Sequence, residues 1–428
     1  MVLGAGYSNR YLTDEETCEL VKQALDTLAV DGLRVLILIP DGTRTMPMPL
    51  MAALFEKYLA PRVKKMDYLV ALGTHQPMTD VQLSKLIGRE VLDGQAGSSH
   101  IYNHLWNEPS TFTQIGTIHA GEIHLLTNGM LSEEVPVRLN KLINNYDQII
   151  ICGPVFPHEV VGFSGGNKYF FPGIAGAEII NFTHWLGALI TSYQIIGSEY
   201  TPVRAVIDRA ASLIPTPVVC FSLVVTHEGL SGIYFGSAQE AWKSAVALSA
   251  KVHIVYVDSP YKKVISVMPE LYDDIWTAAK GMYKMEPVIA EGGEVIIYAP
   301  HITEISYTHG KILDEVGYHC RDFFVKQWEK YKDYPHGVLA HSTHLRGLGI
   351  YDAQKGKETL RIKVTLATGI PEERCKRVGL GYLDPGSLDP QAWQGKEDAG
   401  ILVVPRAGEM LYRIRKRHSG SRGLENEI

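Results

Sequence analysis

RVLILIPDGTRT, residues 34–45, joins an apolar run to a polar loop. The first part, residues 34–39, is hydrophobic on both faces of an extended chain, apart from Arg34 at its start. Strands of this kind are typical of parallel sheets that helices cover on both sides. Asp41 and Gly42 then predict a turn. We therefore expect a buried parallel strand whose carboxyl end opens into a polar loop.

Strands and helices alternate in the same way along the rest of the chain. Thr13 and Glu16 form a capping-box pattern, which predicts a helix that runs to about Leu28. Amphipathic spacing predicts further helices at Val203–Leu213 and Ala238–Ala250. Further strands are predicted at Tyr68–Leu72, Gln148–Cys152, Val218–Val225, His253–Val257, Glu294–Ala299, Arg361–Ala367 and Ile401–Val404. This alternation predicts an α/β fold with mainly parallel sheets.

The length of 428 residues suggests more than one domain. A boundary is expected near Asp258-Ser259-Pro260, where one strand ends in turn residues and another β-like run, Lys263–Met268, begins. We expect two α/β domains, residues 1–258 and 259–428, with mainly parallel, helix-covered sheets and an active-site cleft between them. The basic segment Arg413–Arg422 is expected to be a solvated terminus.

Composition and charge argue against several classes of protein. Lys and Arg total 41 against 47 Asp and Glu, a net charge of −6, which argues against binding to nucleic acid or to an anionic membrane surface. The five cysteines are scattered without CxxC spacing, so neither a disulfide scaffold nor a structural zinc site is indicated. No apolar run approaches the roughly 18 residues of a membrane span. We expect a cytoplasmic protein that binds a small molecule.

Polar clusters follow several of the expected strands directly, at the positions where open α/β sheets bind their ligands. The first cluster holds Asp41 and Arg44, and the second, GTHQP at 73–77, holds His75. Alone, each cluster is more simply explained by an ordinary turn. Together at one edge of the same sheet, they make His75 a candidate acid or base.

The third cluster, FPHEVVGFSGGNK at 156–168, carries the most information. Its Ser-Gly-Gly could present backbone N–H groups to a phosphate, or could form a flexible turn. Neither the GxxxxGK[ST] pattern of a P-loop nor GxGxxG is present, so nucleoside triphosphates and a conventional NAD-dependent oxidoreductase are not indicated. HEG at 227–229 lacks the HExxH continuation of a zincin. NFTH at 181–184 supplies another histidine that could reach the same cleft.

Taken together, these motifs resemble the lactate racemase family, whose members use a nickel-pincer nucleotide. The resemblance rests on DGTR at 41–44, GTHQP at 73–77 and above all HEVVGFSGGNKYFFPGIAG at 158–176. NFTH at 181–184 and AAKGM at 278–282 continue it in the same order. It spans about residues 30–290 and fades beyond 300. The resemblance implies a racemase or epimerase, an isomerase that inverts a stereocentre.

The resemblance also implies a role for each matched residue. Lys168 would be joined covalently to the nickel-pincer nucleotide, a pyridinium-3-thioamide-5-thiocarboxylic acid mononucleotide with nickel, and His184 would be the protein ligand of the metal. Arg44 and Lys280 would hold the substrate carboxylate. His75 and His158 would be the two acid/base groups. The remaining cofactor contacts would come from Asp41, which would bind the ribose, and from Thr43, Ser164, Gly165 and Gly166.

Residues 1–258 would then carry the cofactor site, and residues 259–428 would complete the substrate site. Cofactor-biosynthesis enzymes would be partners during maturation. The implied reaction inverts C2 of a 2-hydroxy acid by hydride transfer to the cofactor, through a 2-oxo acid, while a base takes the hydroxyl proton. Two histidines on opposite sides of the substrate would allow either hand to form. For this task, the pKa values of His75 and His158 are expected to lie near neutrality.

Departures from the family pattern lie around the substrate. Gly42 replaces a histidine, Thr45 replaces a proline, and Thr277 replaces the glutamine of lactate-specific members. Polar segments beyond residue 300 include His309 and His344, which, with Thr277, are candidates to bind substrate hydroxyls. We expect a sugar acid, an aldonate such as gluconate, as substrate. The alternative substrate is a smaller lactate- or malate-like acid, and the alternative function is that of a non-catalytic binding protein of the same fold. The polar segments beyond residue 300 could also be surface loops with chance histidines.

Overall fold

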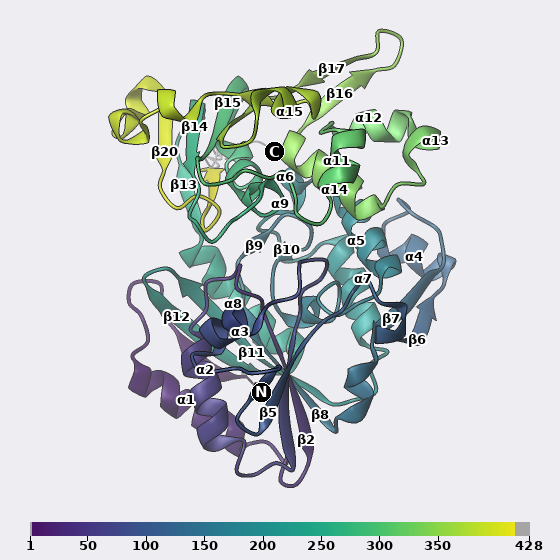
Figure 1. The fold of residues 1–428 in the computed structure, drawn as a ribbon, viewed down its shortest axis with the longest axis vertical. Helices are drawn as coiled ribbons and strands as arrows, with labels where there is room; N and C mark the ends of the chain where they lie inside the picture. The colour runs from purple at the N-terminus through teal and green to yellow at the C-terminus, as the bar shows by residue number, and fades with distance from the viewer. Residues whose placement is uncertain (1, 416–428) are drawn as a thin grey trace, which may run out of the picture.

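The computed structural model describes residues 2–415, and its larger sheet lies in the lower part of Figure 1. Across the sheet, the strands are β1 (Leu3–Gly6), β12 (Gly229–Gly236), β11 (Val218–Thr226), β8 (Gln148–Pro154), β2 (Arg34–Ile39), β3 (Lys65–Val70), β5 (Ser99–Asn103) and β4 (Gln95–Ala96). The neighbouring pairs from β11 to β5 are parallel. The pairs at both edges are antiparallel. The carboxyl ends of β8, β2 and β3 therefore meet at one edge of the sheet.

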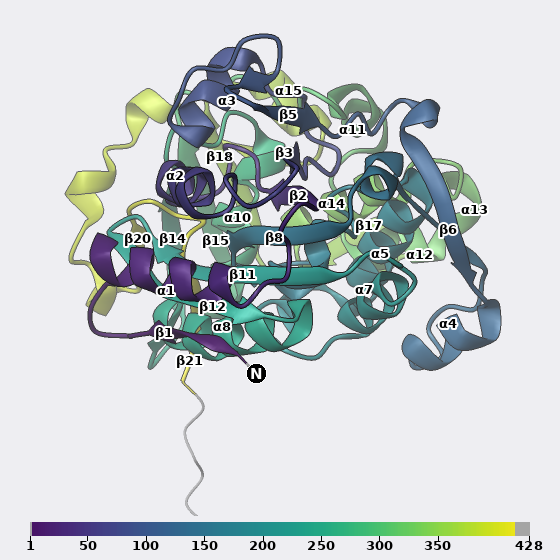
Figure 2. The same cartoon turned by 90° about the horizontal axis from the view of Figure 1, so that it is seen from below.

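Helices cover both faces of this sheet, as the hydrophobicity of β2 predicts. One face, with Val35, Ile37 and Ile39 of β2, packs against α1 (Asp14–Asp26), α2 (Met48–Tyr58) and α3 (Asp80–Ile87). The opposite face, with Leu36 and Leu38, packs against α5 (Ala177–Ile190), α7 (Pro202–Ala211) and part of α8 (Ala238–Val252). In Figure 2, α1 and α2 lie on one side of the sheet and α5 and α7 on the other. Successive side chains of a strand point to opposite faces, so one apolar run serves both cores.

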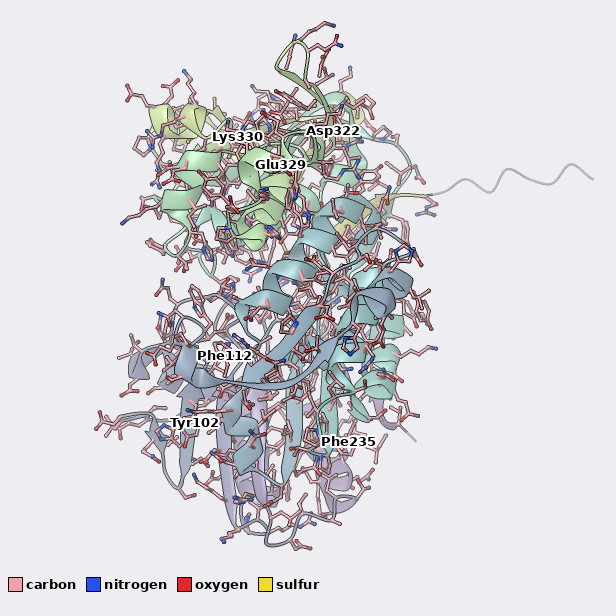
Figure 3. The ribbon with its side chains drawn as sticks, turned by 90° about the vertical axis from the view of Figure 1, so that its right-hand side faces the viewer. Tyr102, Phe112, Phe235, Asp322, Glu329 and Lys330 are labelled. Atoms are coloured by element: carbon pink, nitrogen blue, oxygen red, sulfur yellow. The ribbon has the colours of Figure 1, made fainter. Side chains whose placement is uncertain are left out.

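A second, wholly parallel sheet lies in the upper part of Figure 1. Its strands, in order, are β19 (Gly381–Tyr382), β18 (Lys363–Thr368), β15 (Ile289–Ala299), β14 (Tyr261–Val267) and β20 (Ile401–Val404). The helices of this part are α9 (Ile275–Ala278), α10 (Lys280–Tyr283), α11 (Gly310–Val316), α12 (Arg321–Lys326), α13 (Trp328–Tyr331), α14 (His336–Arg346) and α15 (Glu372–Arg377). Figure 3 shows both parts from the side, with Tyr102, Phe112 and Phe235 in the first and Asp322, Glu329 and Lys330 in the second.

Two smaller hairpins extend from these parts. β6 (Phe112–Ile118) pairs with β7 (Val135–Asn140), with α4 (Ala120–Leu126) between them. β16 (Gly349–Asp352) pairs with β17 (Lys357–Leu360). Among residues 2–415, no helix is both long enough and apolar enough to cross a membrane. The five cysteines are all free thiols.

The two parts are packed together largely through α5, which contacts α13 and α14. The Asn181 side chain on α5 accepts a hydrogen bond from the backbone of Gly337 on α14 at 2.9 Å. The indole of Trp185 stacks on that of Trp328 with ring centroids 5.0 Å apart. Apolar side chains of α5 and α8 belong to the same core as the second sheet. The boundary at residue 258 stays a prediction, because this core continues across it.

Most of the expected elements are confirmed, and the mixed α/β fold with mainly parallel sheets is the observed one. β2 and β20 have the expected ends, and α1 begins at the Thr13–Glu16 capping box. β15 begins at Ile289, before the expected Glu294. The Gly292-Gly293 pair is not typical of a strand, but an irregularity in the pairing of β15 with β14 accommodates it. Both fold class and parallel order follow from the apolar pattern.

The expectation of a solvated terminus is wrong for Arg413. This residue lies in β21 (Leu411–Ile414), which pairs in parallel with β13 (Ile254–Val257). Its guanidinium donates a hydrogen bond to the Ile196 carbonyl. The basic composition of this segment does not indicate a strand, and its partner β13 is distant in sequence, so the pairing could not be predicted. Residues 416–422 of the expected tail lie outside the described residues.

Candidate active site

A cavity of about 100 Å³, which we name the histidine cavity, lies at the carboxyl ends of β8, β2 and β3. Two segments of the second part, α9–α10 and α14, complete its lining. The site residues that sequence reasoning singled out and that line it are Asp41, Arg44, His75, His158, Lys168, His184, Thr277, Lys280 and His344. The structure thus brings together residues more than 300 positions apart in sequence.

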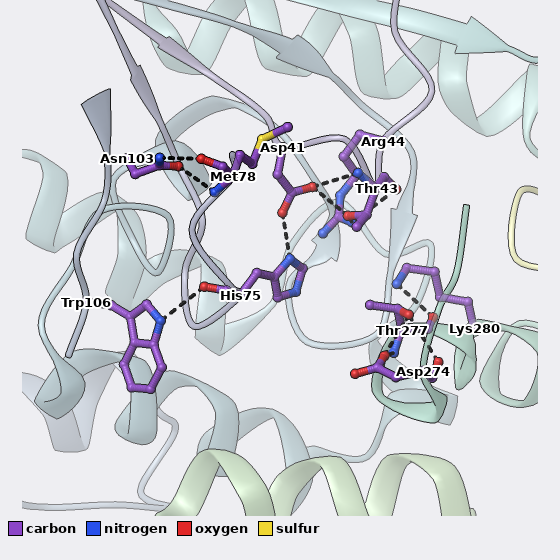
Figure 4. A network of polar contacts seen from close by, with 10 residues as sticks. All are labelled: Asp41, Thr43, Arg44, His75, Met78, Asn103, Trp106, Asp274, Thr277 and Lys280. Atoms are coloured by element: carbon purple, nitrogen blue, oxygen red, sulfur yellow. Dashed lines mark hydrogen bonds and ion pairs between the residues drawn. The ribbon is translucent and has the colours of Figure 1, made fainter. Parts of the chain in front are cut away.

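His75 is held by a carboxylate in the loop after β2. Its Nδ1 lies 2.6 Å from Oδ2 of Asp41, and a dashed line marks this contact in Figure 4. The other oxygen of Asp41 accepts hydrogen bonds from the Thr43 amide at 3.0 Å and the Thr43 hydroxyl at 2.5 Å. Burial alone would raise the pKa of Asp41, but His75, Arg44 and Thr43 together hold it well below its usual range. An ionised Asp41 keeps the proton on Nδ1 of His75 and leaves Nε2 free to exchange a proton.

His158 lies in a two-residue strand, β9 (Pro157–His158), which pairs with β10 (Gly162–Phe163). The first residue of β10 must be glycine, because φ at Gly162 is +82° and a Cβ there would lie 1.9 Å from the Ser198 carbonyl oxygen. The His158 ring is buried, and its Nδ1 accepts a hydrogen bond from the Val160 amide at 3.2 Å. The turn therefore fixes the ring by its own backbone.

The expected pKa near neutrality is wrong for His158. Burial, with the nearby cations of Lys168, Arg44 and Lys280, lowers the pKa of this histidine well below its ordinary value. Glu159 acts in the opposite direction, and its Oε2 lies 3.2 Å from His158 Nδ1. The sequence motif could not reveal this, because the burial of the ring and the positions of Arg44 and Lys280 depend on other segments of the fold. At neutral pH, His158 is therefore uncharged in the free protein.

Two cations from different parts of the chain line the histidine cavity. Arg44 follows β2, and its Nη1 donates to the Thr43 carbonyl at 3.3 Å. Lys280 is buried at the start of α10 and donates to the Thr277 carbonyl at 3.0 Å. Burial and Arg44 lower the pKa of Lys280 to about 8. Figure 4 shows these groups with Asp274, whose carboxylate caps α9 at the Thr277 amide. Arg44 and Lys280 together are suited to bind a carboxylate ligand.

The glycine-rich loop has mostly internal partners. The Ser164 amide donates a hydrogen bond to the Phe156 carbonyl at 2.8 Å, and the Ser164 hydroxyl donates one to the Pro154 carbonyl at 3.0 Å. Ser164 thus has no free amide hydrogen to offer a phosphate, contrary to the sequence interpretation. Gly165 (φ +82°) and Gly166 (φ +58°) form a left-handed turn, and a Cβ on Gly166 would lie 3.1 Å from Trp242. Ser164, Gly165 and Lys168 line a further cavity of about 40 Å³, whereas Gly166 faces the packed core.

Lys168 and His184 have the properties that a lysine-bound nickel cofactor requires. Among the described residues, the Lys168 amine has no hydrogen-bond or ion-pair partner, and burial and Arg44 lower its pKa to about 7. About half of an amine with this pKa is uncharged at pH 7, and the uncharged form is the one that acylation requires. The Nδ1 of His184 donates to the Ile180 carbonyl at 2.7 Å, and burial lowers the pKa of this histidine. A neutral ring anchored in this way presents Nε2 as a metal ligand.

No cluster of three or more His, Cys, Asp or Glu side chains within residues 2–415 could hold a metal by itself. A nickel ion beside His184 would therefore take its other donors from a bound group. The residues present fit the nickel-pincer nucleotide, whose donors are its own sulfur and carbon atoms.

A larger cavity of about 510 Å³ adjoins the histidine cavity, and the two share His75, Trp276 and Thr277 in their linings. His309 lines this larger cavity and packs against Trp276 with ring centroids 4.5 Å apart. His344 lies in the histidine cavity, and its Nε2 is buried without a protein partner. Burial lowers the pKa of each histidine to about 4. Both are therefore neutral hydrogen-bonding groups at neutral pH.

Sequence reasoning missed Trp276 and His341, which lie between the two histidines just described. The rings of Trp276 and His341 stack 4.0 Å apart at an angle of 6°, and both line the histidine cavity. The Nδ1 of His341 is buried without a partner. Trp276 directly precedes Thr277, and His341 begins the polar segment that contains His344, so their neighbours in sequence were the available signal. Glu159, next to His158, was missed in the same way.

Comparison with known proteins links this site to one family. The lactate racemase N-terminal domain matches residues 17–196. The lactate racemase of Lactiplantibacillus plantarum is 24% identical over 307 residues, which cover 69% of this chain and 68% of that protein. The lactate racemase of Thermoanaerobacterium thermosaccharolyticum is 23% identical over 295 residues, which cover 66% of this chain and 65% of that protein.

Two solved structures share the fold. A protein from Thermotoga maritima superposes with a TM-score of 0.89 at 32% identity, covering 96% of this chain and 100% of that one. The lactate racemase apoprotein from Thermoanaerobacterium thermosaccharolyticum superposes with a TM-score of 0.70 at 19% identity, with the same coverage of 96% and 100%. The matched domain and the two related racemases show that this chain is similar to members of the lactate racemase family.

Proposed function

We propose that the protein is a racemase or epimerase that inverts C2 of a 2-hydroxy acid, with a nickel-pincer nucleotide attached at Lys168. The observation that carries this proposal is the convergence of His75, His158, Lys168 and His184 on one cavity that two cations also line. Two candidate bases, a nucleophilic amine and a neutral ligand histidine are the groups such a reaction needs. Cofactor-biosynthesis enzymes would load the site.

The residues of the chain bind the substrate and move its hydroxyl proton. Arg44 and Lys280 bind the carboxylate, with Arg44 offering two parallel N–H donors. His75 takes the hydroxyl proton at Nε2, and Asp41 stabilises the resulting imidazolium through Nδ1. His158 serves the opposite hand of the substrate. When bound, the nickel-pincer nucleotide would supply a hydride acceptor, which no side chain can provide.

We propose an aldonate such as gluconate as the substrate, rather than lactate or malate. Lactate needs room only for a methyl group beyond C2, whereas the adjoining cavity has a volume of about 510 Å³. Its lining offers hydrogen-bonding side chains, among them Gln76, Thr308 and His309. Thr277 and His344 would serve the hydroxyls nearer to C2. A site built for hydroxyls rejects analogues that lack them, because its polar groups are then left unpaired.

Introducing a side chain at Gly42 is expected to discriminate between these substrates. Gly42 lines the larger cavity, and a Cβ there would meet only Met78, at 3.6 Å. Gly42→His should therefore fold and fill part of the cavity. We expect kcat/KM for gluconate to fall at least about tenfold and kcat/KM for lactate to change less, because the loss of substrate contacts worth ~1–3 kcal/mol is enough for a tenfold effect. Gly121→His, where a Cβ meets nothing within 4 Å, is the matched control. Equal changes for both acids would contradict the aldonate assignment.

Intact mass and nickel content test the cofactor proposal. Protein co-expressed with the cofactor-making enzymes should carry a mass increment on Lys168 and about one nickel per chain. His184→Ala should keep the mass increment and lose most of the nickel, because the ring supplies the protein ligand to the metal. His119→Ala, at a side chain that is 76% exposed, should lose neither. Full nickel content in His184→Ala would assign the metal to another ligand.

A further inference from the structure

Glu159 is the carboxylate nearest to His158. Its Oε2 lies 3.2 Å from Nδ1 of the ring, and its side chain is only 18% exposed. Among residues 2–415, no other carboxylate lies within 4.0 Å of a His158 ring nitrogen. Lys280 and His344 approach the same carboxylate from the second part of the chain, and together with His158 they keep the pKa of Glu159 low in spite of its burial. Glu159 is therefore ionised beside a neutral histidine.

A second group competes for the same ring nitrogen. The Val160 amide donates to Nδ1 of His158, also at 3.2 Å. When Nδ1 accepts this bond, the ring proton sits on Nε2, and Nε2 has no lone pair with which to take a proton from a substrate. When Nδ1 instead carries the proton and turns it toward Glu159, Nε2 becomes a base. The two neighbours of Nδ1 thus favour opposite tautomers.

His75 has no such competition. Its Nδ1 faces Asp41 Oδ2 at 2.6 Å, and Thr43 fixes the other oxygen of that carboxylate. The contact with Asp41 therefore favours the His75 tautomer in which Nε2 is a base. His158 reaches the equivalent state only if a carboxylate accepts its Nδ1 proton against the Val160 amide. The two histidines are chemically alike, but they differ in how firmly that state is held.

We propose that Glu159 is a positioning residue, which gives His158 the tautomer and the counter-charge that it needs to act as a base. This inference rests on the proposed function, in which the hydroxyl proton of one epimer goes to Nε2 of His158 and the bound cofactor would supply the hydride acceptor for the C2 hydrogen. Once protonated, His158 is a cation beside the cations of Arg44 and Lys280. Glu159 is the group that offsets their charge.

Glu159→Gln tests this role, because it keeps the shape of the side chain and removes its charge. In single turnover with holoenzyme, formation of the 2-oxo acid from the epimer that uses His158 should slow on the order of 10²–10⁴-fold, as when a histidine base loses its orienting carboxylate. The other epimer, served by His75, should react within about threefold of the native rate, and KM should stay similar. Glu159→Asp should restore part of the loss. Glu286→Gln, at another buried glutamate, is the control.

A second measurement does not depend on turnover. In protein labelled with ¹⁵N-histidine, the His158 signals, assigned by their absence in His158→Asn, should move in Glu159→Gln toward the tautomer protonated at Nε2. Unchanged His158 signals, equal slowing of both epimers in single turnover, or a raised KM with unchanged single-turnover rates would each overturn the proposal. The last result would show that Glu159 acts through Lys280 instead. A tautomer change in a protein that inverts no 2-hydroxy acid would support the role of Glu159 and contradict the proposed function instead.

Discussion

His75→Ala and His158→Ala are each expected to lower the steady-state rate of epimer interconversion about 10³–10⁴-fold, the range found when an acid/base residue is removed from a preorganised site. Each direction of the reaction needs one histidine to take a proton and the other to return it. An enzyme cannot change the equilibrium constant, so kcat/KM should fall by the same factor in both directions. The rates in both directions are measured for each variant by NMR or chiral chromatography with holoenzyme.

Nickel and cofactor content should stay at the native level in both histidine variants, because neither His75 nor His158 is needed to hold the metal. His100→Ala, at a histidine outside the histidine cavity, provides the control for loss of an imidazole. Near-normal rates in His158→Ala, in the presence of full nickel, would show that one histidine suffices and would rule out the two-base scheme.

Lys168→Ala is expected to abolish both the covalent mass increment and the activity. The amine at this position is the attachment point in the proposal, and its pKa of about 7 leaves it substantially unprotonated in neutral solution. Burial favours the uncharged form of a lysine, so the fraction able to attack an acyl group rises as the pH rises through about 7. Intact mass spectrometry after co-expression measures the increment directly.

The pH dependence of Lys168 can be followed in protein without cofactor. An amine-acylating reagent used at pH 7 should modify Lys168 ahead of exposed lysines, and the rate should fall as the pH is lowered below 7. Lys168→Arg keeps a cation in the cavity and should remain unmodified at that position. A mass increment retained in Lys168→Ala would place the attachment elsewhere and contradict the residue assignment.

Those parts of the fold that depend on local pattern could be predicted from the sequence. β2 was predictable because each of its apolar residues faces one of two cores, and α1 because Thr13 and Glu16 cap each other. The convergence of Asp41, His75 and His158 was predictable for a related reason. Their strands are neighbours in a parallel sheet, and the loops after such strands meet at one edge.

Features that depend on distant segments could not be predicted in the same way. The stacking of Trp276 on His341 joins residues 65 positions apart and requires that α9 and α14 meet. The low pKa of His158 arises from burial and from nearby cations, of which Arg44 and Lys280 lie on other segments. The Ser164 amide resembles a phosphate donor in sequence, but a neighbouring carbonyl already accepts its hydrogen. Such contacts become visible only once the chain is folded.

The fate of the C2 hydrogen tests the central claim most directly. Holoenzyme should be incubated with gluconate in D₂O, and the C2 epimer that forms should be examined by ¹H NMR. Hydride transfer within a closed site predicts that the new epimer keeps its original C2 hydrogen, while only the hydroxyl proton exchanges with solvent. Deuterium at C2 that appears in step with inversion would show that a base removes this hydrogen as a proton, and would contradict the proposed reaction.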